Sequence, residues 1–186
     1  MDPFWQEVTA GGLGQGDMIP ACAVPVIRPD FDQATLTPGT PAPVDVQEFD
    51  LIIMTQSCDL ENGKAPLVAC CPIHTLTDFE SVNPDFSKIG QWERVRQGRV
   101  EGLHLLASPT TPDDKWAAYV VNFRIIYSLP IAYLTAHAEK LPKRWRLCPP
   151  YLEHFSQAFA RFFMRVGLPS AIPSYDIQPE RPPAKV

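Results

Sequence analysis

Apolar and polar positions alternate most clearly around two short apolar runs in the first half of the chain. Leu51 to Met54 and Leu67 to Cys71 flank a polar connection over residues 56–64. Short apolar runs bounded by turn-forming residues are typical of buried strands. Strands that are neighbours in sequence usually pair. The pattern therefore predicts two adjacent antiparallel strands joined by a polar loop.

Three further segments have the composition of strands. They cover residues 17–27, 103–107 and 116–126, and the last is the longest strand signal in the chain. Pro20 and Pro25 fall inside the first of these segments. Because proline cannot donate to a strand ladder, we expect an edge strand or a bulge there.

Two segments have the periodicity of amphipathic helices. Apolar residues recur every three or four positions from Pro84 to Arg96 and from Pro149 to Gly167. Proline at the start and glycine at the end of the second segment match the usual helix boundaries. Its apolar stripe includes Phe155, Phe159, Phe162 and Phe163. Two adjacent phenylalanines cannot share one helix face, so we expect one of the last two to reach the surface or a partner.

The fold class that these elements indicate is mainly β, a β-rich α+β fold. We expect a small SH3-like barrel with an inserted helix and a C-terminal amphipathic helix. The chain has 186 residues, of which 21 are proline, and this composition favours short elements and long ordered loops. We expect a single domain over residues 1–169 and a Pro-rich tail over residues 170–186.

The order of the strand motifs resembles that of the MazF/PemK/Kid toxin superfamily. Residues 16–19 (Gly-Asp-Met-Ile), 52–55 (Ile-Ile-Met-Thr) and 71–74 (Cys-Pro-Ile-His) match three strand motifs that recur in this order in that family. The resemblance covers about residues 16–75 and implies an SH3-like barrel and cleavage of RNA. The family usually places Arg-Pro before the second motif, where this chain has Glu48-Phe49-Asp50. Acids there would repel phosphates, which weakens the ribonuclease expectation.

The polar connection is the sharpest candidate site. Its candidate ligand-binding residues are Gln56, Ser57, Cys58, Asp59, Asn62 and Lys64, and the candidate catalytic residues among them are Ser57, Cys58 and Asp59. A thiol nucleophile needs a base nearby, and the histidines of the chain are His74, His104, His137 and His154. In the predicted hairpin His74 lies at the end opposite Cys58. The alternative is structural, with Cys58 as a small packed residue and Asp59 capping the loop.

Charge is unevenly distributed. Residues 1–60 hold nine acids and one base, whereas the later part of the chain contains a basic group. This group consists of Lys140, Lys143, Arg144, Arg146, Arg161 and Arg165. It could hold phosphates of a nucleic acid, with Trp145 and Tyr151 stacking on bases. The alternatives are a solvated face, or pairing with the acidic N-terminal region within one chain or across a homodimer.

The five cysteines predict reduced thiols in a cytoplasmic protein. The first residues lack the basic and apolar regions of a signal peptide, and no apolar run approaches the length of a membrane span. Cys70, Cys71 and His74 invite a metal hypothesis. Adjacent strand residues point to opposite faces, however, so we expect core packing, with no metal site and no cofactor.

These observations favour a non-catalytic binding module of a cytosolic bacterial system. Its partner would be a protein or a nucleic acid, bound at residues 56–64, and no membrane association is expected. One alternative is a MazF-like endoribonuclease. Another is a hydrolase that depends on Cys58, which would need a histidine within hydrogen-bond reach of the thiol.

Overall fold

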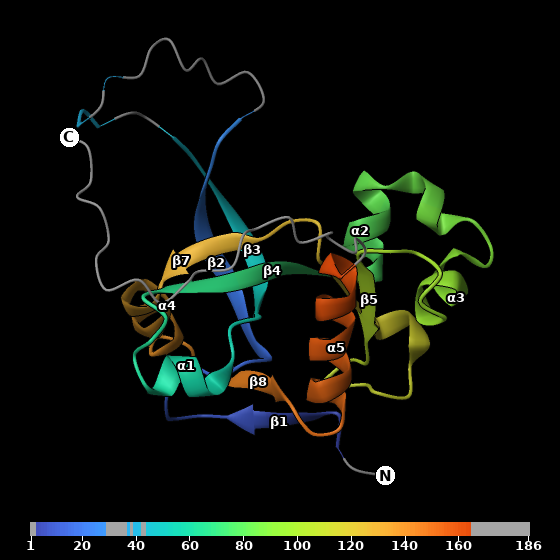
Figure 1. Cartoon of the computed structure of the whole chain (residues 1–186). Coiled ribbons are helices and arrows are strands. Elements are labelled where there is room, and N and C mark those ends of the chain that lie inside the picture. The colour runs from blue at the N-terminus through green and yellow to red at the C-terminus, as the bar shows by residue number, and fades with distance from the viewer. Residues whose placement is uncertain (1–2, 29–36, 38, 42–43, 165–186) are drawn as a thin grey trace, which may run out of the picture.

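The computed structural model describes residues 3–28, 37, 39–41 and 44–164 (Figure 1). Within these ranges eight strands form one antiparallel sheet in the order β1-β8-β2-β3-β4-β6-β5, with β7 also paired to β4. The strands are β1 Trp5–Val8, β2 Asp17–Val26, β3 Asp45–Ile53, β4 Leu67–Thr75, β5 Leu103–Leu106, β6 Tyr119–Asn122, β7 Tyr127–Pro130 and β8 Arg144–Leu147. The predicted β-rich class is confirmed, and a small barrel-like arrangement is consistent with this sheet.

The two apolar runs that dominate the sequence pattern are neighbouring strands, as predicted. Leu51 of β3 lies opposite Pro72 of β4, and Ile53 lies opposite Cys70 in an antiparallel register. Residues 51–54 of the first run and Val68, Cys70 and Cys71 of the second are buried at the centre of the sheet, whereas Leu67 at the start of β4 is exposed. Their continuous apolar character follows from burial on both faces.

The centre of the sheet has a hydrophobic cluster on each face. Cys70 packs in one cluster with Leu60 and Leu134, whereas Cys71 packs in the other with Phe155. The predicted opposite orientation of the two cysteines is therefore confirmed. Helices α1 and α4 contribute to the first cluster and α5 to the second. In Figure 1, α5 lies apart from α1 and α4.

The predicted irregularity in the first long strand is confirmed. The register of β2 against β3 shifts between Ile19 and Cys22, and Ala21 adopts a positive φ of 51°. The backbone N–H of Ala21 donates to the carboxylate of Asp50 at 2.8 Å. This bond satisfies a donor that the bulge removes from the strand ladder.

The expected long strand over residues 116–126 is wrong. The chain forms a short 3-10 helix, η3 (Lys115–Ala117), and then β6, and it turns before β7 begins at Tyr127. Asn122 starts the turn, since its side-chain oxygen accepts the backbone N–H of Arg124 at 3.1 Å. β6 and β7 then pair with different halves of β4. The single strand β4 thus pairs with two separate strands along its length.

The expected single helix over residues 84–96 is also wrong. Helix α2 (Leu76–Val82) comes first, followed by the 3-10 helix η2 (Pro84–Ser87) and by α3 (Gln91–Arg96). Pro84 disfavours helical geometry at the residue before it, and Gly90 at φ 85° separates η2 from α3. These short helices share a small core with β5 and β6, in which Phe79, Phe86 and Trp92 are in mutual ring contact.

The remaining helices are α1 (Ser57–Glu61), α4 (Ile131–Ala138) and α5 (Tyr151–Phe163). The first two were not predicted: residues 56–64 were expected to be a loop, and residues 131–138 received no assignment. The C-terminal amphipathic helix is confirmed, and it starts two residues after Pro149. Its predicted end at Gly167 and the predicted tail over residues 170–186 lie outside the described residues.

All five cysteines are free thiols, in agreement with the prediction. Four of them are buried, and Cys58 is exposed. None of the helices in the described ranges has the length and apolarity that a membrane span requires.

Candidate functional site

The predicted 56–64 site is partly committed to internal contacts. The hydroxyl of Ser57 accepts the backbone N–H of Gln15 at 3.0 Å, and the side chain of Gln15 donates to the carbonyl of Met54 at 2.9 Å. These two bonds fasten the glycine-rich segment 11–16 to the start of α1 and to the residue that follows β3. Lys64 is exposed, and its backbone N–H closes the segment on the carbonyl of Asp59 at 2.9 Å.

The thiol of Cys58 is on the surface, next to other polar side chains. Its sulfur lies 3.7 Å from Gln56 Oε1 and 3.9 Å from Asp59 Oδ1. The side-chain amide of Asn62 donates to the Cys58 carbonyl at 2.6 Å. Among the residues that the structure describes, no histidine contacts this thiol. The segment therefore lacks the imidazole that would activate a thiol nucleophile.

Two members of the predicted basic group form a buried ion cluster with Asp17. Asp17 is fully buried, and its carboxylate accepts hydrogen bonds from Arg144 Nε at 2.9 Å and from Arg146. The backbone N–H of Gly14 adds a further bond at 2.9 Å. Both guanidinium groups also donate to the carbonyl of Gly12. These arginines organise the glycine-rich segment, and their role in holding phosphates stays a prediction.

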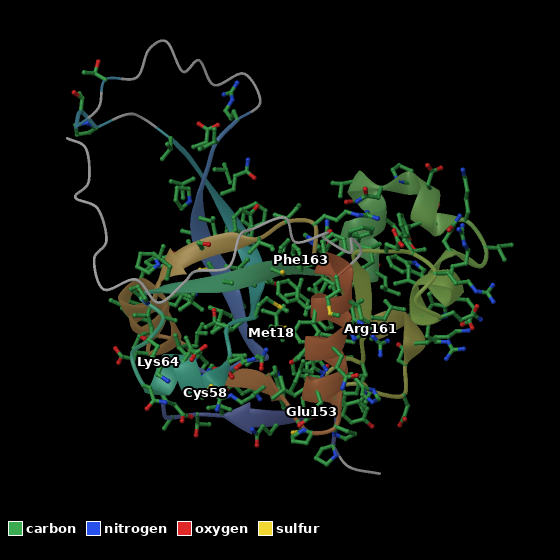
Figure 2. The ribbon with its side chains drawn as sticks, in the orientation of Figure 1. Met18, Cys58, Lys64, Glu153, Arg161 and Phe163 are labelled. Carbon is green, nitrogen blue, oxygen red and sulfur yellow. The ribbon has the colours of Figure 1, made fainter. Side chains whose placement is uncertain are left out.

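The other predicted basic and aromatic residues are dispersed. Lys143 pairs with Glu7 at 2.8 Å and lies over the ring of Trp145, while Tyr151 stacks on Phe4. The expected pairing of the basic group with the acidic N-terminal region is thus found within one chain. Arg165 lies outside the described residues, and Lys140 is exposed. Arg161 is separate from this group, on α5 (Figure 2).

A cavity of about 690 Å³ lies where Arg161 projects from α5. Its walls are the end of α3, the turn that leads into β5, β5 itself and the second half of α5. Figure 2 places Arg161 on α5, well away from Cys58 and Lys64 on the α1 side. The cavity is therefore distinct from the site that the sequence pattern predicted.

One stripe of α5 faces this cavity. His154, Gln157, Ala158 and Arg161 all line it, and their spacing of three, four and seven residues places them along one side of the helix. The neighbouring stripe, which includes Phe155, packs into the sheet. The docking of the apolar stripe therefore determines which polar side chains reach the cavity.

His104 lies in the cavity wall opposite α5. Its ring stacks on Phe123, with 5.9 Å between centroids and 21° between planes, and it contacts Phe155 at 5.7 Å. Burial lowers the pKa of His104 to about 4, and the nearby His154 adds to this effect. The imidazole is therefore neutral at neutral pH. Its ring nitrogens have no hydrogen-bond partner among the described residues, and both histidines line the same cavity.

Two arginines stand at the cavity, and their environments differ. Arg96 is held by Glu93 through two hydrogen bonds of 2.7 and 2.6 Å. Arg161 has no ion-pair partner within the described part of the chain. Glu101 also lines the cavity. Arg161 is thus the cation that remains available to a bound anion.

The turn that forms one cavity wall depends on Gly102. This residue has a positive φ of 79°, and a Cβ at this position would lie 2.8 Å from Cγ of Arg124. Its carbonyl accepts the backbone N–H of Phe123 at 2.8 Å. The absence of a side chain at Gly102 therefore lets the turn before β5 pack closely against the turn after β6.

Comparison of the chain with models of protein families, with curated proteins and with solved structures finds no match. The MazF-like resemblance of residues 16–75 therefore stays a prediction. Arg161 was expected to act in one group with Arg144 and Arg146, from which the structure separates it. His104 and His154 were considered only as possible bases for Cys58, and Gln157 was not singled out. The helical spacing of His154, Gln157 and Arg161, next to the apolar stripe, is the sequence pattern that could have indicated the side of α5 that lines the cavity.

Proposed function

We propose that the protein is a binding module whose ligand occupies the cavity between α3, β5 and α5. The observation that carries this proposal is the convergence, on a partly apolar cavity, of polar side chains that have no hydrogen-bond or ion-pair partner among the described residues. His104, His154, Gln157 and Arg161 supply these groups, and Phe123 and Phe162 supply apolar surface. Binding sites for small molecules commonly combine a concave apolar surface with a few converging polar groups.

Arg161 gives the cavity a binding group for an anionic ligand. Two arginines and one glutamate line it, and Arg96 is already engaged by Glu93. Arg161 keeps a planar set of donors that can bind a carboxylate or a phosphate through two hydrogen bonds. A ligand with an anionic group and an apolar body would use both parts of the cavity.

Endoribonuclease activity is a second candidate for a specific reason. Cleavage of a phosphodiester needs a proton acceptor, a proton donor and a cation, and His104, His154 and Arg161 line one cavity. Binding ranks first because the low pKa of His104, about 4, makes it a weak base at neutral pH. A hydrolase that depends on Cys58 has less support, since among the described residues its thiol has polar contacts with Gln56 and Asp59 and with no histidine.

The proposed setting is the cytoplasm of a bacterial cell. The five free thiols support a reducing compartment. A protein or nucleic-acid partner at residues 56–64, and a homodimer, stay predictions.

Phenyl phosphate, which combines a dianion with a flat apolar ring, is a suitable probe for calorimetry on the full chain. We expect the wild-type protein to bind it and Arg161→Gln to bind it about tenfold more weakly, because a charge-assisted contact is lost. Arg94→Gln is the matched control. Arg94 is an exposed arginine of α3 whose side chain contacts Gln91 and does not line the cavity. Equal binding by wild type and Arg161→Gln would contradict the proposed site.

A further inference from the structure

The geometry points to a nucleotide as the occupant of this cavity, an inference that rests on the proposed function. The base would lie in the inner part of the cavity, beside His104 and Phe123, and the phosphate would lie at Arg161. The inference depends on three features: the hydrogen-bonding capacity of the inner wall, its aromatic character, and the distance along α5 to the available cation.

The inner wall offers hydrogen bonds rather than charge. A neutral imidazole carries one N–H donor and one acceptor nitrogen. None of the described residues forms a hydrogen bond with either nitrogen of His104. Across the cavity, the exposed Gln157 of α5 adds an amide with a donor and an acceptor, and its side chain also has no partner among those residues. A ligand without hydrogen-bonding edges would bury these groups unsatisfied, at a cost in affinity.

The same wall favours a flat ring. His104 and Phe123 lie nearly parallel, with 21° between their planes, and Phe162 lines the cavity as well. Aromatic and imidazole rings commonly stack on nucleobases. A heteroaromatic ring can form hydrogen bonds with the polar groups and also pack against the apolar surface. A phenyl ring can only pack against the apolar surface.

The length of the polar stripe matches that of a nucleotide. His154 and Arg161 are seven residues apart on α5, which corresponds to about 10 Å along the helix axis. This is roughly the distance that a base, a ribose and a phosphate span together. The cavity volume of about 690 Å³ falls within the usual range for small-molecule sites, about 300 to 1,000 Å³.

Calorimetry on the full chain with AMP, UMP, adenosine, phenyl phosphate and inorganic phosphate tests this inference. We expect AMP or UMP to bind at least tenfold more tightly than phenyl phosphate, and adenosine to bind more weakly than AMP. Arg161→Gln should weaken AMP binding about tenfold and leave adenosine binding unchanged. His104→Phe, which keeps an aromatic ring, should weaken AMP binding more than it weakens phenyl phosphate binding. Arg94→Gln should alter neither.

The outcomes separate the inference from the proposed function. If phenyl phosphate binds as tightly as both nucleotides and depends on Arg161, the ligand is an aryl phosphate such as a phosphotyrosine, and the nucleotide inference is overturned alone. If none of the probes binds, or if Arg161→Gln has no effect, the proposed site fails as well. Binding of a 5′-phosphorylated RNA tetranucleotide tells whether the nucleotide ligand is an RNA end or a free nucleotide. Tighter binding than AMP supports an RNA end as the ligand, and weaker binding supports a free nucleotide.

Discussion

At the scale of single residues, the ion cluster of Asp17 is a feature with a large expected effect on stability. Arg144 is nearly as buried as Asp17, and the side chain of Arg146 is about one-quarter exposed. Removing one partner of a buried ion pair leaves an uncompensated charge in a region of low dielectric constant. The cluster also holds the glycine-rich segment through carbonyls of Gly11 and Gly12.

Asp17→Asn should therefore lower the free energy of unfolding by about 3 to 5 kcal/mol. The matched control is Glu7→Gln, which breaks the exposed pair with Lys143 and should cost less than about 1 kcal/mol. Urea unfolding followed by tryptophan fluorescence measures both. Similar midpoints for the two variants would show that the cluster contributes no more than a surface pair.

The buried imidazole of His104 gives a prediction with a defined pH window. Its pKa falls from 6.5 in the unfolded chain to about 4 in the folded protein. Between these values the unfolded chain binds a proton that the folded protein does not, so stability declines as the pH falls from about 6.5 to about 4. The contribution reaches about 3 kcal/mol at most, and it is absent above pH 6.5.

Unfolding free energies of the wild type and His104→Phe, measured from pH 7.5 to pH 4, isolate this contribution. The difference between the two proteins should be constant above pH 6.5 and should change below it in favour of the variant, which cannot take up the proton. Carboxylates titrate in both proteins and cancel in the difference. Parallel profiles down to pH 4 would mean that His104 titrates alike in the folded and unfolded chains.

At the scale of secondary structure elements, α5 links the fold to the candidate site. Phe155 is fully buried and contacts Phe123, which in turn stacks on His104. The helix thus packs its apolar stripe into the sheet and presents the adjacent polar stripe to the cavity. Any change that loosens the docking of α5 should affect stability and ligand binding together.

Phe155→Ala should lower the free energy of unfolding by about 3 to 5 kcal/mol, because it removes a fully buried aromatic side chain from this interface. Phe163 is 56% exposed near the end of the same helix, and Phe163→Ala should change stability by less than about 1 kcal/mol. Thermal unfolding of the two variants measures the difference. An unchanged melting temperature for Phe155→Ala would contradict the docking of α5.

The elements that the sequence predicted well are those with a long or strongly periodic pattern. The strands around Leu51 and Leu67 and the C-terminal helix belong to this group. The prediction failed for residues 116–126, because pairing with β4 divides this apolar segment. At Asn122 the side-chain oxygen accepts the backbone N–H of Arg124, and the chain turns between β6 and β7. The prediction also failed at α4, whose apolar residues follow Pro130 and merge with the preceding strand signal.

At the scale of the whole molecule, the sequence predicted a β-rich fold, and its candidate site at residues 56–64 differs from the cavity that we propose. Residues 56–64 stand out because their polar side chains are adjacent in the chain. The cavity residues come from α3, β5 and α5, and His104 and His154 are fifty residues apart. Only the fold brings these side chains together, so a local pattern could not identify the site.

The most direct test of the central claim is an NMR titration of the histidine side chains with AMP. The account predicts that the ring signals of His104 and His154 shift with one common dissociation constant, while those of His74 and His137 do not move. His137 donates a ring N–H to the carbonyl of Pro20, and His74 contacts Phe79. Neither histidine lines the cavity. Shifts confined to signals other than those of His104 and His154, or no shifts at millimolar AMP, would contradict the account.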